Sequence, residues 1–109
     1  MSHCIVIIDD EEVLTRVMTR VLVRHGYEVK VSNSCAEAWR ALSECHPIHH
    51  VLVDITLRDG DGLALAQAIH VKYPDVPVTL MTGNVAPLSC QLPLLLKPYS
   101  TEDLYAAVA

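Results

Sequence analysis

Apolar and polar residues follow two different patterns along the chain. Short runs rich in apolar, β-branched residues recur five times, and most are continuous, as in strands buried on both faces. The run 27–32 alternates instead and is expected nearer a sheet edge. Between the runs, apolar residues recur every three or four positions, as along the buried face of a helix. The predicted strands cover residues 4–8, 27–32, 51–54, 76–81 and 92–96.

Capping and helix-breaking residues set the bounds of the predicted helices. Ser34 and Ser100 each open a helix with a capping pattern. Pro87 leaves room for at most about two helical turns before the fifth strand, so the helix there is expected to be short or absent. The other predicted helices run from Val13 to His25-Gly26, from Ser34 to His46-Pro47, from Gly62 to Tyr73-Pro74 and from Leu104 to Val108.

Strands that alternate with helices predict an α/β fold, and the length suits one domain covering residues 1–109. The expected architecture is a flavodoxin-like, doubly wound parallel sheet of five strands in the order 2-1-3-4-5. In this topology ligands bind beyond the carboxyl ends of the strands, where the strand order reverses between strands one and three.

Polar residues stand at the carboxyl ends of four of the predicted strands. Asp9 and Asp10 follow the first strand, Asp54 ends the third, Thr82 follows the fourth and Lys97 follows the fifth. Because neighbouring strands lie about 4.8 Å apart, the three carboxylates are expected to converge at one point at the carboxyl end of the sheet. Thr82 and Lys97 are then expected beside them.

These side chains suit phosphoryl transfer. Three close carboxylates repel one another, and a hard cation such as Mg²⁺, which prefers oxygen ligands, relieves that repulsion. A carboxylate can also act as a nucleophile and carry a phosphoryl group. Around a phosphoryl group on Asp54, the metal, the Lys97 ammonium and the Thr82 hydroxyl would supply the positive charge and hydrogen bonds that this chemistry needs.

Each of these residues also has an ordinary structural interpretation. A single Asp54 can cap the loop that follows it, and residues 9–12 can be the acidic first turn of a helix, which the helix dipole favours. Thr82 alone is more often a loop cap, and Lys97 alone is more often a surface charge. The ordered set at four strand ends, rather than any single residue, favours a functional site.

The chain resembles the receiver domains of two-component response regulators over essentially its whole length. The motifs that carry this resemblance are Asp9-Asp10, Asp54 with the Asp61-Gly62 turn, Thr82-Gly83 and Lys97-Pro98. The resemblance implies that Asp54 is the phosphoacceptor, that Lys97 pairs with the phosphoryl group and that Thr82 is the switch hydroxyl. It also implies that the Lys97–Pro98 peptide bond is cis.

The same resemblance implies the metal ligands and the partners. Asp54, Asp10 and the backbone carbonyl of Thr56 would bind Mg²⁺ directly, and Asp9 would act mostly through a metal-bound water. The phosphoryl donor would be a histidine kinase, a histidine phosphotransfer protein or a small acyl phosphate. The domain would be a phosphoacceptor switch that catalyses only its own phosphorylation and dephosphorylation, not an enzyme acting on other substrates.

Three features depart from the usual family pattern. Leu94 stands where the family has an aromatic residue three positions before the lysine, so the coupling of Thr82 to a rotating ring does not carry over. Arg58 stands where the family commonly has proline. The segment between Thr82 and Lys97 is shorter than usual, which looks more like the receivers of hybrid histidine kinases than those of transcription factors.

Charge and composition argue against several other classes of protein. A net charge of −5 disfavours general nucleic-acid binding by this domain. No apolar run approaches the ~18 residues of a membrane span, and the N-terminus has no signal-peptide pattern. The four cysteines, at 4, 35, 45 and 90, lack the spacing of a zinc site, so reduced thiols in a cytoplasmic protein are expected. Segment 45–50, with one cysteine and three histidines, is interpreted as a solvated loop rather than a transition-metal site.

Three functions are compatible with the residues. The favoured one is a phosphoacceptor switch in a two-component phosphorelay. The alternative is a receiver-like docking module that binds a partner without being phosphorylated, and Leu94 and the short fourth-helix segment motivate it. A Mg²⁺-dependent phosphatase is disfavoured, because Ile55 and Thr56 after Asp54 offer no acid–base residue.

Overall fold

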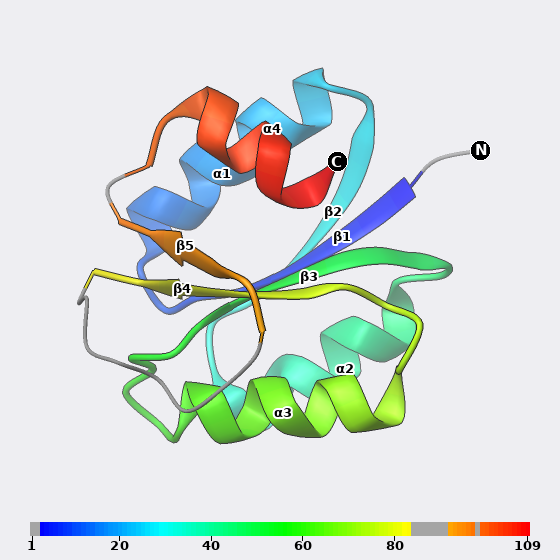
Figure 1. Cartoon of the computed structure of the whole chain (residues 1–109), viewed down its shortest axis with the longest axis vertical. Helices are drawn as coiled ribbons and strands as arrows, with labels where there is room; N and C mark the ends of the chain where they lie inside the picture. The colour runs from blue at the N-terminus through cyan, green and yellow to red at the C-terminus, as the bar shows by residue number, and fades with distance from the viewer. Residues whose placement is uncertain (1–2, 84–91, 98) are drawn as a thin grey trace.

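The sheet has the predicted topology. A computed structural model describes residues 3–83, 92–97 and 99–109. Its five parallel strands form one sheet in the order β2-β1-β3-β4-β5, which confirms the predicted flavodoxin-like fold (Figure 1). The strands are β1 (His3–Ile8), β2 (Tyr27–Ser32), β3 (Ile48–Asp54), β4 (Val78–Thr82) and β5 (Leu94–Leu96).

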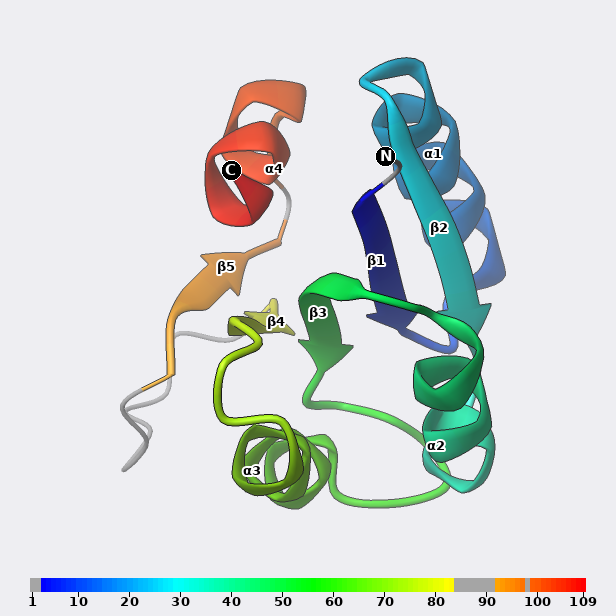
Figure 2. The same cartoon turned by 90° about the vertical axis from the view of Figure 1, so that its right-hand side faces the viewer.

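Helices cover both faces of the sheet, α1 and α4 on one and α2 and α3 on the other (Figures 1 and 2). The short helix expected within residues 85–91 falls outside the described residues. The label α4 therefore refers to the C-terminal helix. None of the described helices is long and apolar enough to cross a membrane. The helices are α1 (Glu12–Arg24), α2 (Cys35–Glu44), α3 (Gly62–Lys72) and α4 (Thr101–Val108).

Side chains of the central strands alternate between two apolar cores. Val6 and Val53 point into the core beneath α2 and α3, whereas Ile7 and Leu52 point into the core beneath α1 and α4. Burial on both faces explains why β1 from Cys4 to Ile8 and β3 from Val51 to Val53 are continuously apolar. At the carboxyl ends of these two strands, polar side chains begin with Asp9 and Asp54.

The predicted caps form, but β3 begins earlier than the sequence predicted. The Ser34 side chain accepts a hydrogen bond from the Glu37 N–H, and Ser100 forms a capping box at the start of α4. Strand β3 starts at Ile48 rather than at residue 51, and its register against β1 shifts between Cys4 and Ile5. Two histidines, at 49 and 50, made this part of the strand look like a loop.

The histidines of segment 45–50 that lie in β3 make structural contacts. His49 Nε2 lies 2.8 Å from the carbonyl oxygen of Val108, which ties the end of α4 to β3. His50 is buried, with its Nε2 2.7 Å from Thr79 Oγ1. In the described part of the chain, these histidines belong to no group of side chains that could hold a metal ion.

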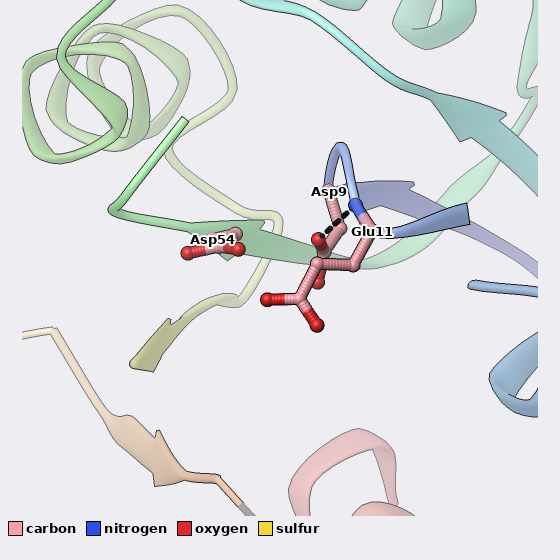
Figure 3. A group of neighbouring side chains, drawn as sticks. All are labelled: Asp9, Glu11 and Asp54. Carbon is pink, nitrogen blue, oxygen red and sulfur yellow. Dashed lines mark hydrogen bonds between the residues drawn. The ribbon is translucent and has the colours of Figure 1, made fainter. Parts of the chain in front are cut away.

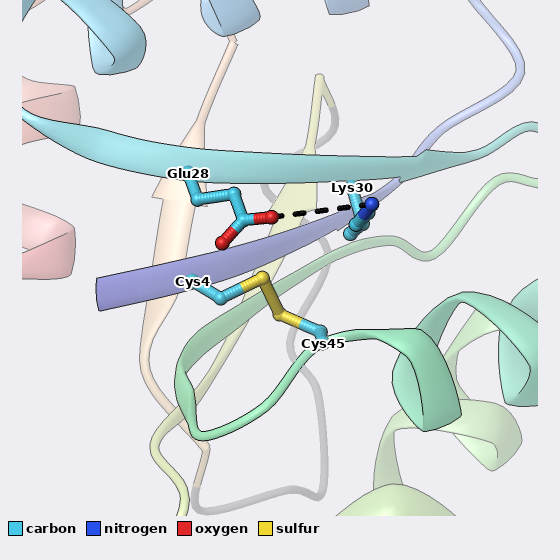
Figure 4. Close-up of a disulfide and its surroundings, with 4 residues drawn as sticks. All are labelled: Cys4, Glu28, Lys30 and Cys45. Carbon is cyan, nitrogen blue, oxygen red and sulfur yellow. Dashed lines mark ion pairs between the residues drawn. A yellow bond between two sulfur atoms is a disulfide. The ribbon is translucent and has the colours of Figure 1, made fainter. Parts of the chain in front are cut away.

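One expectation about the cysteines is wrong. Cys4 and Cys45 form a disulfide with their Cα atoms 5.8 Å apart, so these two are not reduced thiols (Figure 4). The bond joins β1 to the residue that follows the last turn of α2. Their spacing of 41 residues gave no sign of this pairing, because only the fold brings them together. Cys35 is a free thiol.

The buried His50 predicts a pH dependence of stability. Burial, with a smaller contribution from the charge of His49, lowers the pKa of His50 to about 4. Below about 6.5 the unfolded state therefore binds more protons at this residue than the folded state does, and stability falls as the pH decreases towards about 4. We expect wild type to lose about 1–2 kcal/mol more than His50→Leu between about pH 7 and about pH 5.

Urea unfolding of both proteins across this pH range measures the difference. His70→Gln is the matched control, because His70 is exposed on α3. Equal losses of unfolding free energy in wild type and His50→Leu would contradict the prediction.

Candidate functional site

The carboxyl ends of the strands bring together residues that are distant in the sequence. Asp54 is the last residue of β3, and Asp9 follows β1 directly. Lys97 follows β5, and its backbone N–H donates a 2.7 Å hydrogen bond to the carbonyl oxygen of Thr82, the last residue of β4. Asp9, Asp54 and Thr82 are all buried.

Lys97 is the centre of this group. Its Nζ lies 3.0 Å from Asp54 Oδ2 and 3.1 Å from Asp9 Oδ2. A third carboxylate oxygen, Oε1 of Glu11, lies 3.4 Å from the same nitrogen. Asp9 and Asp54 have almost no exposed side-chain surface, whereas the Glu11 side chain is 56% exposed. The Lys97 ammonium therefore neutralises part of the negative charge of the two buried carboxylates. On its solvent side it also pairs with the Glu11 carboxylate.

The two oxygens of the Asp54 carboxylate have different partners. Oδ1 accepts hydrogen bonds from the Thr56 N–H at 2.8 Å and from the Thr56 hydroxyl at 2.7 Å, while Oδ2 accepts one from Lys97. Burial opposes ionisation of Asp54, but the Thr56 hydrogen bonds and the Lys97 charge outweigh it and hold the pKa of this carboxyl below its ordinary value. Asp54 is therefore ionised at neutral pH.

Asp9 has a different electrostatic environment from Asp54. Burial raises the pKa of Asp9 to about 6, although the Glu11 N–H and the Lys97 ammonium both favour its ionised form. Burial alone would disfavour the Lys97 ammonium, but its hydrogen bonds to Asp54 and Asp9 raise the pKa of Lys97 above its ordinary value. One ammonium thus serves three carboxylates, and the group retains excess negative charge.

Oxygens of Asp9, Glu11 and Asp54 form a possible cation site, since they all lie within 4.8 Å of one another (Figure 3). Three carboxylate oxygens are the donor set that a hard divalent cation such as Mg²⁺ prefers. Sequence reasoning missed Glu11, which it assigned to the helix dipole. The turn that brings Glu11 in is closed by its own N–H, which donates a 2.9 Å hydrogen bond to Asp9 Oδ1.

Asp10 lies outside this group in the described structure. Its Oδ2 accepts a 2.9 Å hydrogen bond from the Arg58 N–H and lies 3.8 Å from the Arg58 Nε. Asp10 thereby ties the loop after β1 to the loop after β3. The position occupied by Arg58, where the family commonly has proline, is what makes this backbone N–H available.

The loop after Asp54 is also held where α2 and α3 begin. The Asp59 carboxylate accepts hydrogen bonds from the N–H groups of Cys35 and Ala36 at the start of α2, which hold its pKa below the ordinary value. Asp61 caps α3 by accepting hydrogen bonds from the N–H groups of the second and third residues of that helix. A Cβ atom at Gly62 would lie 2.6 Å from the Cα of Ile55, so only glycine lets α3 start this close to the end of β3.

A tyrosine that the sequence did not single out anchors the chain after Lys97. The Tyr99 hydroxyl lies 2.8 Å from the sulfur of Met18 in α1, and burial raises the pKa of Tyr99 to about 12. Leu94, which replaces the expected aromatic residue, is 41% exposed on β5. The predicted cis Lys97–Pro98 peptide bond falls outside the described residues.

The fold and this arrangement of side chains define a receiver domain. The sequence model of the response regulator receiver domain family matches residues 5–109, and the chain belongs to this family.

Individual relatives agree with this assignment. The acid tolerance regulatory protein ActR of Rhizobium meliloti is 30% identical over an alignment of 111 positions, which covers 95% of this chain and 57% of ActR. The chain spans about half the length of the curated relatives it matches.

Solved structures share the fold. A response regulator from Burkholderia pseudomallei, whose structure holds a phosphorylated aspartic acid, a calcium ion and citrate, superposes with a TM-score of 0.83 at 26% identity. The match covers 99% of this chain and 67% of that one. The receiver domain of the hybrid histidine kinase CckA has a TM-score of 0.81 at 24% identity, over 96% of this chain and 94% of that one. At that identity the likeness shows the fold alone.

The contact at Gly62 predicts that this position tolerates only glycine. We expect Gly62→Ala to lower the free energy of unfolding by about 2–3 kcal/mol, because the added methyl group overlaps the backbone of Asp54 and Ile55. Gly83→Ala is the matched control, since a Cβ atom there meets no heavy atom within 4 Å.

Urea unfolding of the two variants and of wild type measures the effect. A Gly62→Ala variant as stable as Gly83→Ala would show that α3 can move away from β3 at little cost.

Proposed function

We propose that residues 1–109 form a phosphoacceptor switch of a two-component phosphorelay, with Asp54 as the residue that is phosphorylated. The observation that carries this proposal is the buried, ionised Asp54 carboxylate, which accepts hydrogen bonds from Thr56 and Lys97. It lies at the carboxyl end of the sheet, in a group of side chains with excess negative charge. The related Burkholderia structure holds a phosphorylated aspartic acid and a metal ion in the same fold, which supports it.

The carboxylate cluster is the proposed Mg²⁺ site. By resemblance to the family, Asp54, Asp10 and the backbone carbonyl of Thr56 would bind the metal directly, and Asp9 would act mostly through water. Asp10 would have to exchange its hydrogen bond to Arg58 for the metal, while Glu11 already lies within the cluster. When bound, Mg²⁺ neutralises the carboxylates and the oxygens of the incoming phosphoryl group.

The contacts of Asp54 indicate how its carboxylate reacts. Among the described residues, Oδ1 accepts two hydrogen bonds from Thr56, whereas Oδ2 accepts only the one from Lys97. We assign Oδ2 as the nucleophile. As the Oδ2–P bond forms, the P–N bond of the donor phosphohistidine breaks, and its electron pair returns to the imidazole. The Lys97 ammonium then moves from Oδ2 to a phosphoryl oxygen.

The switch itself would follow from new hydrogen bonds to the phosphoryl group. The Thr82 hydroxyl is the expected partner, since Thr82 ends the strand between β3 and β5. Its movement and that of the loop carrying Asp59 would shift the population between two conformations. With Leu94 in place of the aromatic residue, the shift would be read from these loops rather than from a rotating ring.

The proposed partners are those of a phosphorelay. The donor is a histidine kinase or a histidine phosphotransfer protein, and the domain would act in the cytoplasm, where such donors carry their phosphohistidine. Direct nucleic-acid binding by this domain is not expected, because its net charge is −5.

Intact-mass measurement after incubation with Mg²⁺ and acetyl phosphate tests the proposal. We expect wild type to gain one phosphoryl group, and Asp54→Asn or omission of Mg²⁺ to abolish the gain, because the nucleophile or its neutralising cation is missing. Asp75→Asn, the same change in an exposed turn at the other end of the sheet, should behave like wild type.

The other outcomes distinguish the rival functions. A phosphoryl gain that persists in Asp54→Asn would place the acceptor elsewhere. No gain in wild type, together with failure to form a beryllofluoride complex, would favour the docking module that works without phosphorylation. Steady hydrolysis of an added phosphomonoester, lost in Asp54→Asn, would favour the phosphatase.

A further inference from the structure

We propose that Cys4 and Cys45 form a reversible thiol–disulfide site that controls how firmly α2 is held against the sheet (Figure 4). This proposal concerns the amino end of the sheet, opposite Asp54, and does not depend on phosphoryl transfer. The co-reactant is a dithiol or its disulfide, the common class of cellular thiol–disulfide exchange partners.

Helix α2 has little apolar surface to hold it in place. It has 10 residues, and its buried ones are Ala38, Ala41 and Leu42. Two of these three are alanines, which bury far less area than Met18 and Leu22 of α1. In contrast to α1, α2 therefore depends strongly on the contacts at its two ends.

Each end of α2 is fastened by a specific interaction. At the N-terminus, the Asp59 carboxylate accepts hydrogen bonds from the N–H groups of Cys35 and Ala36, at 2.9 and 3.2 Å. At the C-terminus, Cys45 caps the helix and is bonded through its sulfur to Cys4 in β1. Because β1 lies between β2 and β3, this bond connects the end of α2 to an interior strand of the sheet.

Both redox states are expected to fold. The two apolar cores hold all five strands and α1, α3 and α4 together without the bond. After reduction, two buried thiols would pack in the same place, as small apolar side chains do. The disulfide bridges 41 residues of sequence, so its presence adds stability mainly by restricting the unfolded chain.

The exchange reaction balances as a two-electron step. A thiolate of the dithiol attacks one sulfur of the Cys4–Cys45 bond, and that bond breaks to leave a mixed disulfide and one protein thiolate, which takes up a proton. The second thiol of the reagent then displaces the other cysteine, which gives two protein thiols and an oxidised reagent. Both sulfurs belong to residues that are 1% exposed, so reaction requires the end of α2 to open.

A loosening of α2 would also affect the loop that follows Asp54. Asp59 in this loop is bound to the first residues of α2, so a mobile α2 removes one of the contacts that hold the loop. Redox state at the amino end of the sheet would thereby alter the mobility of a loop at the carboxyl end.

The chain carries its own probe of this motion. Its single tryptophan, Trp39, lies on α2 and is 38% exposed. Acrylamide quenching of Trp39 fluorescence therefore reports on α2 alone. We would compare wild type oxidised with glutathione disulfide and wild type reduced with dithiothreitol, with the linkage verified by peptide mapping under non-reducing conditions.

We expect a Cys4–Cys45 linked peptide in the oxidised protein, which reduction removes and re-oxidation restores. Reduction should lower Tm by about 10 °C or more and increase quenching of Trp39, while the far-UV circular dichroism remains that of a folded α/β domain. Cys45→Ser should resemble reduced wild type in both conditions. Cys35→Ser, which removes the free thiol at the start of α2, should respond like wild type.

Three results would overturn the proposal. The first is that the linked peptide does not form with glutathione disulfide, or is not reduced in the native protein. The second is that oxidised and reduced wild type share the same Tm and the same quenching. The third is that reduction unfolds the whole domain, which would make the bond a structural requirement rather than a control on α2. The comparison of the two wild-type forms stands even if Cys45→Ser fails to fold.

Discussion

The placement of one ammonium group among buried carboxylates determines how the carboxyl end of this sheet is built. Asp9 and Asp54 could not both be buried and ionised without Lys97, because isolated charges in a protein interior are costly. Lys97 in turn is positioned by the backbone hydrogen bond from its N–H to Thr82 and by the anchor at Tyr99. Strands β1, β3, β4 and β5 therefore each contribute to a single electrostatic unit.

The sequence was sufficient to predict the fold and the location of this unit. Continuous apolar runs separated by helical periodicity define a parallel sheet with two covered faces, and in such a sheet all strands end at one edge. Residues at the end of a strand or directly after it, such as Asp54, Asp9 and Lys97, can therefore be placed without a structure. The roles proposed for them in phosphoryl transfer stay predictions.

Individual side-chain contacts in the loops and between helices and strands could not be predicted in the same way. Glu11 enters the cluster because a tight turn folds it back, and Asp10 leaves it because Arg58 offers a backbone N–H. Cys4 and Cys45 meet only because α2 ends above the start of β1. For Asp10 and for the two cysteines, the deciding contact joins atoms whose separation is set by the packing of whole elements, which residue spacing does not encode. For Glu11 the deciding contact is a local hydrogen bond to Asp9, which competes with a place in the first turn of α1.

The two ends of the described chain lie beside each other, far from Asp54. The ring of His3 at the start of β1 packs edge-on against that of His49, with ring centroids 4.8 Å apart, and His49 Nε2 lies within hydrogen-bond distance of the carbonyl oxygen of Val108 near the end of α4. A polypeptide attached to either end would emerge at the amino end of the sheet and leave the carboxyl end, with its carboxylates, uncovered. This geometry would let the domain be embedded in a longer chain, as in the longer relatives it matches, without steric interference at Asp54.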